Sequence, residues 1–276
     1  MERLASELAE NLEAFRALFH APENCDFVVR ELAPHGVRMA ALYIDGMANR
    51  RNLEDMVLRP LMNMRPFGGM APEGRSAALA AQVLPTGTGK LESGVRKIAD
   101  FVLDGNCAVL CDGCAQAVLA EMPGFASRAV DQPPIESAAF APHEAFNETI
   151  RTNLTLLHRI LRTPDFVTEI LEIGDSSKTK VAVTYLSGVA NPAVVREVKR
   201  RLEGVEVDRL LSIGQLQQLL IEPFAVGILH GVAVLDRRIL EDRPGPGVDK
   251  QHLARLQAGF AHDLLRRDRQ RADLGG

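Results

Sequence analysis

Two stretches, ALYIDGMAN at 41–49 and VTYLSGVAN at 183–191, decide the fold because they are two copies of one pattern. Tyr43 and Tyr185 lie 142 positions apart, and the same spacing separates Asn49 from Asn191. Self-similarity at a fixed spacing indicates that one structural unit is used twice. The chain is therefore expected to contain two similar lobes.

Each copy reads as a helix, a strand, a short loop, a second strand and a second helix. The opening helices share an apolar stripe with steps of four, four, three and four residues, as a helix buried on one face requires; its members are Leu4, Leu8, Leu12, Phe15 and Phe19, then Phe146, Ile150, Leu154, Leu157 and Leu161. The first strands are DFVVREL and DFVTEIL, at 26–32 and 165–171. The second strands, 38–45 and 180–187, are too continuously apolar for a sheet with one wet face. The first copy has the longer loop between helix and strand, at 21–25.

The helices that follow are expected at 50–64 and 192–203. Asn49 and Asn191 precede them as N-caps, and Pro192 occupies the favoured first helical position. A further strand closes each copy, at 105–113 and 230–236. Strands alternating with helices predict an α/β fold of two similar lobes, each a small mixed sheet flanked by helices.

The lobe boundaries follow from composition. The segment DQPPIESAAFAPH is rich in Pro and Ala and has neither helix nor strand period, so it is read as a linker. The predicted division is a first lobe at 1–130, the linker at 131–142, a second lobe at 143–240 and a charged helical tail at 241–276.

The bulk composition is that of a soluble globular protein. Of 276 residues, 46% are hydrophobic and 25% charged, and the formal net charge is −4 with no Trp. The acidic balance and the scarcity of aromatic residues argue against nucleic acid as a partner. No signal peptide is read at Met1, and the apolar run 224–235 is too short to span a bilayer, so the chain itself is expected to be soluble.

Two long motifs carry a family resemblance. The first opens the second copy and consists of Glu144, Phe146, Glu148, Ile150, Arg151, Thr152 and Asn153. The second consists of Ser177, Lys178, Thr179, Lys180, Val181, Ala182, Tyr185, Leu186, Gly188, Val189, Ala190, Asn191 and Pro192. In this order and spacing they resemble the A-subunit type of the GerA spore germination proteins, over about residues 1–222. After Glu222 the match is loose, and the transmembrane helices that follow in the family are absent; a soluble-only homologue, a trimmed chain and an altered end all fit this pattern.

The resemblance implies a sensory or assembly role. A subunits of the family work with B and C subunits as receptors in the spore inner membrane, form oligomers and respond to nutrients by releasing ions. The expected function is therefore non-enzymatic, through subunit assembly and signal transmission, with no cofactor, no metal and no catalytic residue. The alternative is a two-lobe module that captures a small polar nutrient between its lobes. A nucleotide-dependent enzyme that uses residues 85–90 is the least favoured interpretation.

The helix motif supplies the first candidate site. Glu144, Asn147, Glu148, Arg151 and Thr152 form a polar face, with Asn153 beside it in the motif, and Arg151 is placed to pair with Glu148. The face is interpreted as a contact surface for a partner subunit or ligand. A plain solvated helix face has the same appearance.

The loop GDSSKTK at 174–180 supplies the second candidate site. Ser177, Lys178 and Lys180 suit an anion held by backbone N–H groups and positive charge. The alternative is a hairpin whose lysines lie in water.

Other motifs are weaker. PTGTGK at 85–90 resembles a phosphate loop, but Leu84 and Leu91 stand where the motif needs a glycine or alanine and a hydroxyl residue, so a turn leading into a helix at 92–103 is expected. The pair Cys111 and Cys114 is read as packing at the end of a buried strand, with metal or redox chemistry as the alternative. The seven histidines show no metalloprotease spacing, and His158 is expected to be partly buried.

Overall fold

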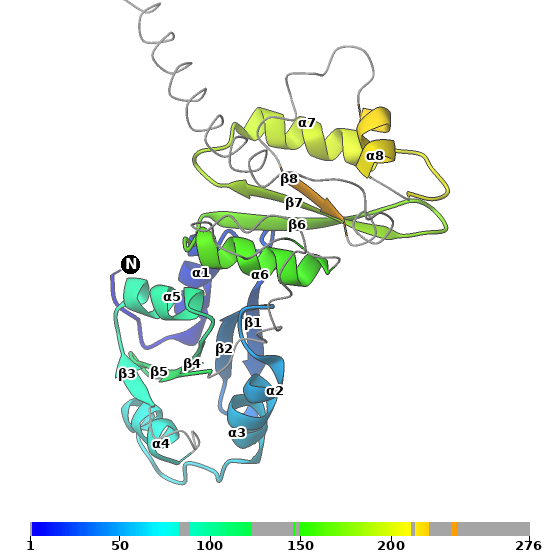
Figure 1. Ribbon diagram of the computed structural model, residues 1–276. Coiled ribbons are helices and arrows are strands. Elements are labelled where there is room, and N and C mark those ends of the chain that lie inside the picture. The colour runs from blue at the N-terminus through cyan, green and yellow to red at the C-terminus, as the bar shows by residue number, and fades with distance from the viewer. Residues whose placement is uncertain are drawn as a thin grey trace, which may run out of the picture. The chain divides into compact units, whose positions relative to one another are not determined.

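The computed structural model describes residues 2–82, 89–122, 146, 149–210, 213–220 and 233–236 (Figure 1). The chain divides into two compact units. The first contains residues 1–144 and 151–169, and the second contains 145–150 and 170–276. The predicted linker and tail fall outside the described residues.

The first unit is a five-stranded sheet covered by helices. In chain order its elements are α1 (Leu8–Leu18), β1 (Phe27–Leu32), β2 (Met39–Ile44), α2 (Arg50–Leu53), a π-helical turn (Glu54–Leu58), α3 (Arg59–Asn63), α4 (Arg75–Gln82), β3 (Lys90–Glu92), α5 (Val95–Leu103), β4 (Cys107–Cys111) and β5 (Ala117–Ala120). The strand order is β1-β2-β4-β5-β3, and each neighbouring pair runs antiparallel. The predicted α/β class is confirmed. The sheet was predicted to be mixed, but all of its neighbouring strands are antiparallel, because the long connection after β2 brings the chain back as β4 in the opposite direction.

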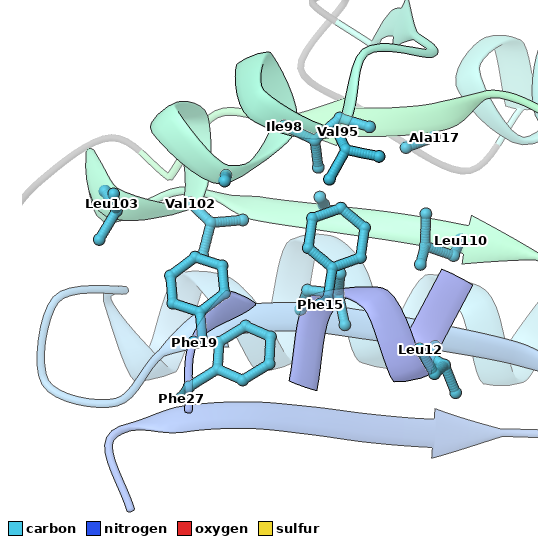
Figure 2. Close-up of a cluster of buried hydrophobic side chains, with 14 of the residues drawn as sticks. Leu12, Phe15, Phe19, Phe27, Val95, Ile98, Val102, Leu103, Leu110 and Ala117 are labelled. Atoms are coloured by element: carbon cyan, nitrogen blue, oxygen red, sulfur yellow. The ribbon is translucent and has the colours of Figure 1, made fainter. Parts of the chain in front are cut away.

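Both faces of this sheet are buried, as the continuous apolar runs predicted. On one face α1 and α5 pack over the strands, with Phe15 and Ile98 fully buried and Phe19 stacked on Phe27 at 4.2 Å between ring centroids (Figure 2). On the other face the strands contact α2, α3 and α4 through a second cluster that includes Leu61. Successive residues of a strand point to opposite faces, so alternate members of β2 and β4 join alternate clusters.

The second unit repeats the scheme with fewer strands. Its elements are the end of β6 (Phe166–Ile173), β7 (Thr179–Leu186), α7 (Pro192–Glu203), α8 (Ile213–Leu220) and β8 (Ala233–Asp236), and the sheet order is β6-β7-β8. Val181 and Val183 of β7 pack against Val198 and Leu202 of α7. The helix α6 (Ile150–Ile160) and the start of β6 belong mainly to the first unit.

The repeated stretch folds the same way in both units. Tyr43 lies in β2 and Tyr185 in β7, each the second strand of its copy. The turn that follows places a glycine at positive φ, +88° at Gly46 and +79° at Gly188. The next helix is capped by an asparagine in both copies: the side chain of Asn49 accepts from Asn52 N, and that of Asn191 from Ala193 N. The predicted correspondence of elements therefore holds.

Two predicted boundaries differ from the structure. The helix expected at 92–103 begins at Val95, because Lys90–Glu92 pairs with β5 as the short strand β3. By contact clustering, Arg151–Glu169 join the first unit, whereas the predicted division places them in the second lobe, which starts at 143. The reason is a set of polar contacts from α6 to the β1 and β2 ends, described below. None of the helices in the described part of the chain has the length and apolarity needed to cross a bilayer.

Candidate functional site

The helix α6 is held on the first unit by a buried acid–histidine pair. His158 Nε2 lies 3.0 Å from Asp26 Oδ2, and the two side chains are only 3% and 7% exposed. The rings of His158 and Phe166 pack in a T-shaped arrangement, with their centroids 4.7 Å apart. Asp26 directly precedes β1, so the pair joins the start of the first strand to the last turns of α6. Loss of either side chain leaves the other polar group buried without its partner, which typically costs about 1–3 kcal/mol.

Asn24 adds a second link beside this pair. Its amide nitrogen donates to the carbonyls of Phe19 and Phe166, at 3.1 Å each. Its amide oxygen accepts from the backbone N–H groups of Asp26 and Thr168, at 3.3 Å each. The side chain is 2% exposed, so one residue satisfies four buried backbone groups on two segments of the unit.

The N-terminal half of α6 contacts the turn after β2. Arg151 forms an ion pair with Asp45. Thr155 Oγ1 lies 3.1 Å from the carbonyl oxygen of Gly46 and 2.9 Å from that of Arg151, so its one proton is shared between these two acceptors. A methyl group added to Gly46 would lie 2.9 Å from Thr155 Oγ1, so glycine permits the close approach of the helix. We call the whole set the α6 clamp; its members are Asn24, Asp26, Asp45, Gly46, Arg151, Thr155 and His158.

The residues of the predicted polar face of α6 differ in their exposure and partners. Arg151 forms an ion pair with Asp45 of the same unit, whereas the sequence had placed it to pair with Glu148. Thr152 is exposed, whereas Asn153 is buried. Glu144, Asn147 and Glu148 lie outside the described residues.

The loop at 174–180 uses its backbone donors internally. The N–H groups of Asp175, Ser176 and Ser177 bond to the carbonyls of Val207 and Asp208. Ser177 Oγ also accepts from Leu210 N at 3.3 Å. The Asp208 carboxylate bonds to the Ser176 hydroxyl, which places a negative charge at the loop. The backbone donors of Asp175, Ser176 and Ser177 are therefore not free to bind an anion, which argues against the anion-binding interpretation of Ser177. Lys180 is exposed, and Lys178 adopts a positive φ of 43°.

The remaining sequence motifs show no reactive arrangement. Lys90 lies in β3 and pairs with Glu121 at 3.7 Å, whereas a phosphate loop needs this lysine at the start of a helix. Residues 85–88 of that motif lie outside the described residues. Within the described part of the chain no group of three or more His, Cys, Asp or Glu side chains is placed to hold a metal ion. His158 Nδ1 is buried without a hydrogen-bond partner, so the Asp26–His158 pair is not extended to a nucleophile.

Sequence reasoning identified Arg151 and the burial of His158 but not Asn24, Asp26, Asp45 or Gly46. One signal for part of this site was present. The loop at 21–25, longer in the first copy than in the second, carries Asn24 and leads into Asp26. Its partner segment lies more than 130 positions away, and nothing in a single sequence states that pairing.

Comparisons with known proteins agree with this fold. The family described as Bacillus/Clostridium GerA spore germination protein matches residues 13–227. Spore germination protein KA of Bacillus subtilis (strain 168) is 24% identical over 220 residues, which cover 79% of this chain and 40% of that protein. Spore germination protein B1 of the same strain is 27% identical over 225 residues, 81% of this chain and 46% of that protein. The chain thus spans less than half the length of these relatives.

A solved structure shows the same architecture. It is the crystal structure of the N-terminal domain of the A subunit of the Bacillus megaterium spore germinant receptor GerK3. The TM-score is 0.64 with 23% sequence identity, and the match covers 86% of this chain and 93% of that domain. The α/β fold built on two copies of one unit is therefore shared with that domain. From the match over residues 13–227, the chain belongs to the GerA spore germination protein family.

Proposed function

We propose that this chain acts in nutrient-triggered spore germination as the N-terminal region of a germinant receptor A subunit. Its role is non-enzymatic: it assembles with B- and C-type subunits and with further copies of itself at the spore inner membrane, and it transmits the nutrient signal. Relatives that match most of the chain are named as spore germination proteins, and a solved relative is named as a receptor A subunit domain.

The α6 clamp is the observation that carries this proposal. It fixes the helix that opens the second sequence copy onto the first unit, through Asp26 and His158 at the core of the contact. The strand β6 follows α6 directly, with residues up to Glu169 in the first unit and residues from Ile170 in the second. A change in the seating of α6 is therefore passed into a strand that both units use.

The chemistry of the clamp supports a structural role for its polar groups. Asn24 has both its amide nitrogen and its amide oxygen engaged by backbone partners. Asp26 and His158 are buried against each other and are out of reach of a substrate. Groups arranged in this way hold segments together, whereas a catalytic base needs an exposed face toward the reacting proton.

The experiment compares two histidines of the first unit in spores of the organism that encodes the chain. His158→Ala removes the buried partner of Asp26. His35→Ala is the matched control, since His35 is also hydrogen-bonded, to Met64 O at 2.7 Å, but lies in the short helix Pro34–Gly36 and is not part of the α6 clamp. Nutrient-triggered ion release, receptor amount and co-purification of B and C subunits are measured for each.

The expected result is a reduced response for His158→Ala and a normal one for His35→Ala. A response that falls together with receptor amount places the clamp in assembly. A response that falls at unchanged receptor amount places it in signal transmission. A normal response and normal co-purification in His158→Ala would overturn the proposal.

The exposed remainder of the predicted polar face is proposed as the surface for a partner subunit or ligand. Thr152 is its exposed described member; Glu144, Asn147 and Glu148 extend it along the sequence. Thr152→Arg places a long charged side chain on this surface and is expected to weaken co-purification of B and C subunits without changing thermal stability. Unchanged co-purification would remove Thr152 from the surface.

A further inference from the structure

Cys111 and Cys114 stand at the two ends of one tight turn. Cys111 is the last residue of β4, and Cys114 N donates to Cys111 O at 3.1 Å, with Gly113 at a φ of +81°. A turn closed in this way holds its first and last Cα atoms within about 7 Å. A disulfide needs Cα atoms about 4.4–6.8 Å apart. Both side chains are buried in the same cluster on one face of the sheet, so the two sulfurs share one environment at the ends of the turn.

The start of α4 faces this pair of thiols. Ser76, in the first turn of α4, donates its hydroxyl to Gln116 O at 2.7 Å, which holds the start of the helix against the segment that follows Cys114. Arg75 Nη1 lies 3.3 Å from Asp112 O, which brings the guanidinium to the turn that carries both cysteines. Arg75 Nε is buried without a hydrogen-bond partner, so this positive group is not neutralised there.

These contacts make the two thiols unequal. The hydrogen bond from the Cys111 thiol, then the groups of Ser76 and Arg75, lower the pKa of Cys114 against the opposing effect of burial. The same hydrogen bond, with burial, raises the pKa of Cys111. The carbonyl of Pro72, 2.9 Å from Cys114 Sγ, accepts from the protonated form and opposes the thiolate. Several donors and one cation act against this single carbonyl, so we expect Cys114 to be the thiolate of the pair.

We propose that Cys111 and Cys114 are a redox site that forms a reversible intramolecular disulfide by exchange with a small-molecule disulfide, with Cys114 attacking and Cys111 resolving. This goes beyond the proposed role of the chain in germination, because it depends on the β4 turn and α4 and not on the α6 clamp. Cys107 has no such arrangement: it is completely buried, and burial raises its pKa to about 12.

The exchange balances in two steps. The Cys114 thiolate attacks one sulfur of the disulfide RSSR, which forms a Cys114–SR mixed disulfide and releases RS⁻. The released RS⁻ takes the proton of Cys111, and the Cys111 thiolate then attacks Cys114 Sγ and expels the second RS⁻. Two cysteine sulfurs are oxidised and one RSSR is reduced to one RSH and one RS⁻, the second of which takes a proton from water, so no further oxidant is needed.

The segment Pro72–Gly74 lies over the pair. Pro72 contacts Gly113 as well as Cys114, and Cys111 and Cys114 are only 1% and 3% exposed. A small disulfide therefore reaches Cys114 only when this short, mostly exposed segment moves aside. The proposal thus predicts exchange that is slower than that of a free surface thiol of similar pKa.

The test uses the purified full chain in a Cys25→Ser background, which removes the exposed thiol and leaves three cysteines. The reduced protein is incubated at pH 7 with oxidised glutathione, quenched in acid, alkylated in denaturant and weighed intact by mass spectrometry. We expect the number of alkylated cysteines to fall from three to one, with the remaining label on Cys107 in the peptide map.

Variants assign the two roles. Cys111→Ser is expected to retain one glutathione on Cys114, since the resolving thiol is gone, and Cys114→Ser to retain none. Arg75→Gln is expected to form the disulfide more slowly than the parent at pH 7 and at the same rate near about pH 9, where the thiolate no longer depends on the guanidinium. Three alkylated cysteines in the parent after oxidation, or an adduct on Cys107, would overturn the proposal.

Discussion

At the scale of single residues, Gly46 is a position where the turn after β2 approaches the helix α6 closely. An alanine there meets two obstacles: a φ of +88°, which disfavours a side chain, and Thr155 Oγ1 at 2.9 Å. We expect Gly46→Ala to lower the free energy of unfolding of the first unit by about 2–4 kcal/mol. Faster hydrogen exchange at the amides of α6 checks this result.

The repeat supplies the matched control. Gly188 occupies the same place in the second copy with a φ of +79°, but an added methyl group meets nothing within 4 Å. Gly188→Ala is therefore expected to cost only about 1 kcal/mol, from the backbone alone, and to leave exchange in α6 unchanged. Equal effects of the two substitutions would show that the contact with Thr155 contributes nothing.

Asn24 tests the polar part of the clamp. Asn24→Ala leaves four buried backbone groups without a partner, and we expect the free energy of unfolding to fall by about 2–4 kcal/mol in urea denaturation. Glu23→Ala, at an exposed position of the same loop, is the control and is expected to change stability by less than about 0.5 kcal/mol. A loss no larger than that of the control would contradict the assignment of Asn24 as a link.

At the scale of elements, Glu92 at the start of α5 is expected to make the stability of the protein depend on pH. Glu92 Oε1 accepts from Gly94 N at 2.8 Å and Ser93 N at 2.9 Å, and these bonds, with Lys97 nearby, lower the pKa of Glu92 below its usual 4.5. Because the pKa is lowered by folding, the carboxylate stabilises the protein above the unfolded value and loses this effect as the pH falls through the folded value. Glu92→Gln is expected to be less stable than the parent by about 0.5–1 kcal/mol at pH 7.

The measurement is thermal or urea unfolding of the parent and Glu92→Gln from pH 7 to pH 3. The difference in stability should stay constant down to about pH 4.5 and shrink below it. A difference that persists unchanged at pH 3 would show that the charge of Glu92 has no part in it.

The repeated elements were predictable because their signals are local. Apolar periodicity, the Asn–Pro helix start at 191–192 and the glycine turns all act within a few residues, and they place β1, β2, β6, β7 and α7. The short strands β3 and β5 were missed. Residues 90–92 and 117–120 have no strand signal of their own and become strands only by pairing with each other and with β4.

The clamp was predictable only in part, for the same physical reason. The motif on α6 pointed to Arg151, and its helical register pointed to the burial of His158. Their partners Asp45 and Asp26 are ordinary acidic residues at strand ends, and only the folded chain brings them to α6. Burial of polar groups that satisfy each other over long sequence distances leaves no local pattern.

At the scale of the whole molecule, family membership and the clamp together define the proposed role. The chain has the fold of a germinant receptor A subunit domain, and the contacts of α6 tie the start of the second copy to the first unit. In this proposed role, the seating of α6 on the first unit is needed for the response to nutrients. Arg151 is the residue at which an internal contact and a subunit contact are directly distinguishable.

The most direct test is a charge swap between Asp45 and Arg151, measured as the rate of nutrient-triggered ion release from spores at equal receptor amount. Asp45→Arg and Arg151→Asp each place like charges together, and each is expected to slow the response about fivefold for a loss of about 1 kcal/mol in the seating of α6. The double variant restores the ion pair with its signs exchanged, and we predict a response equal to that of the parent. A double variant as slow as Arg151→Asp alone would contradict the account and assign Arg151 to a contact with a partner subunit.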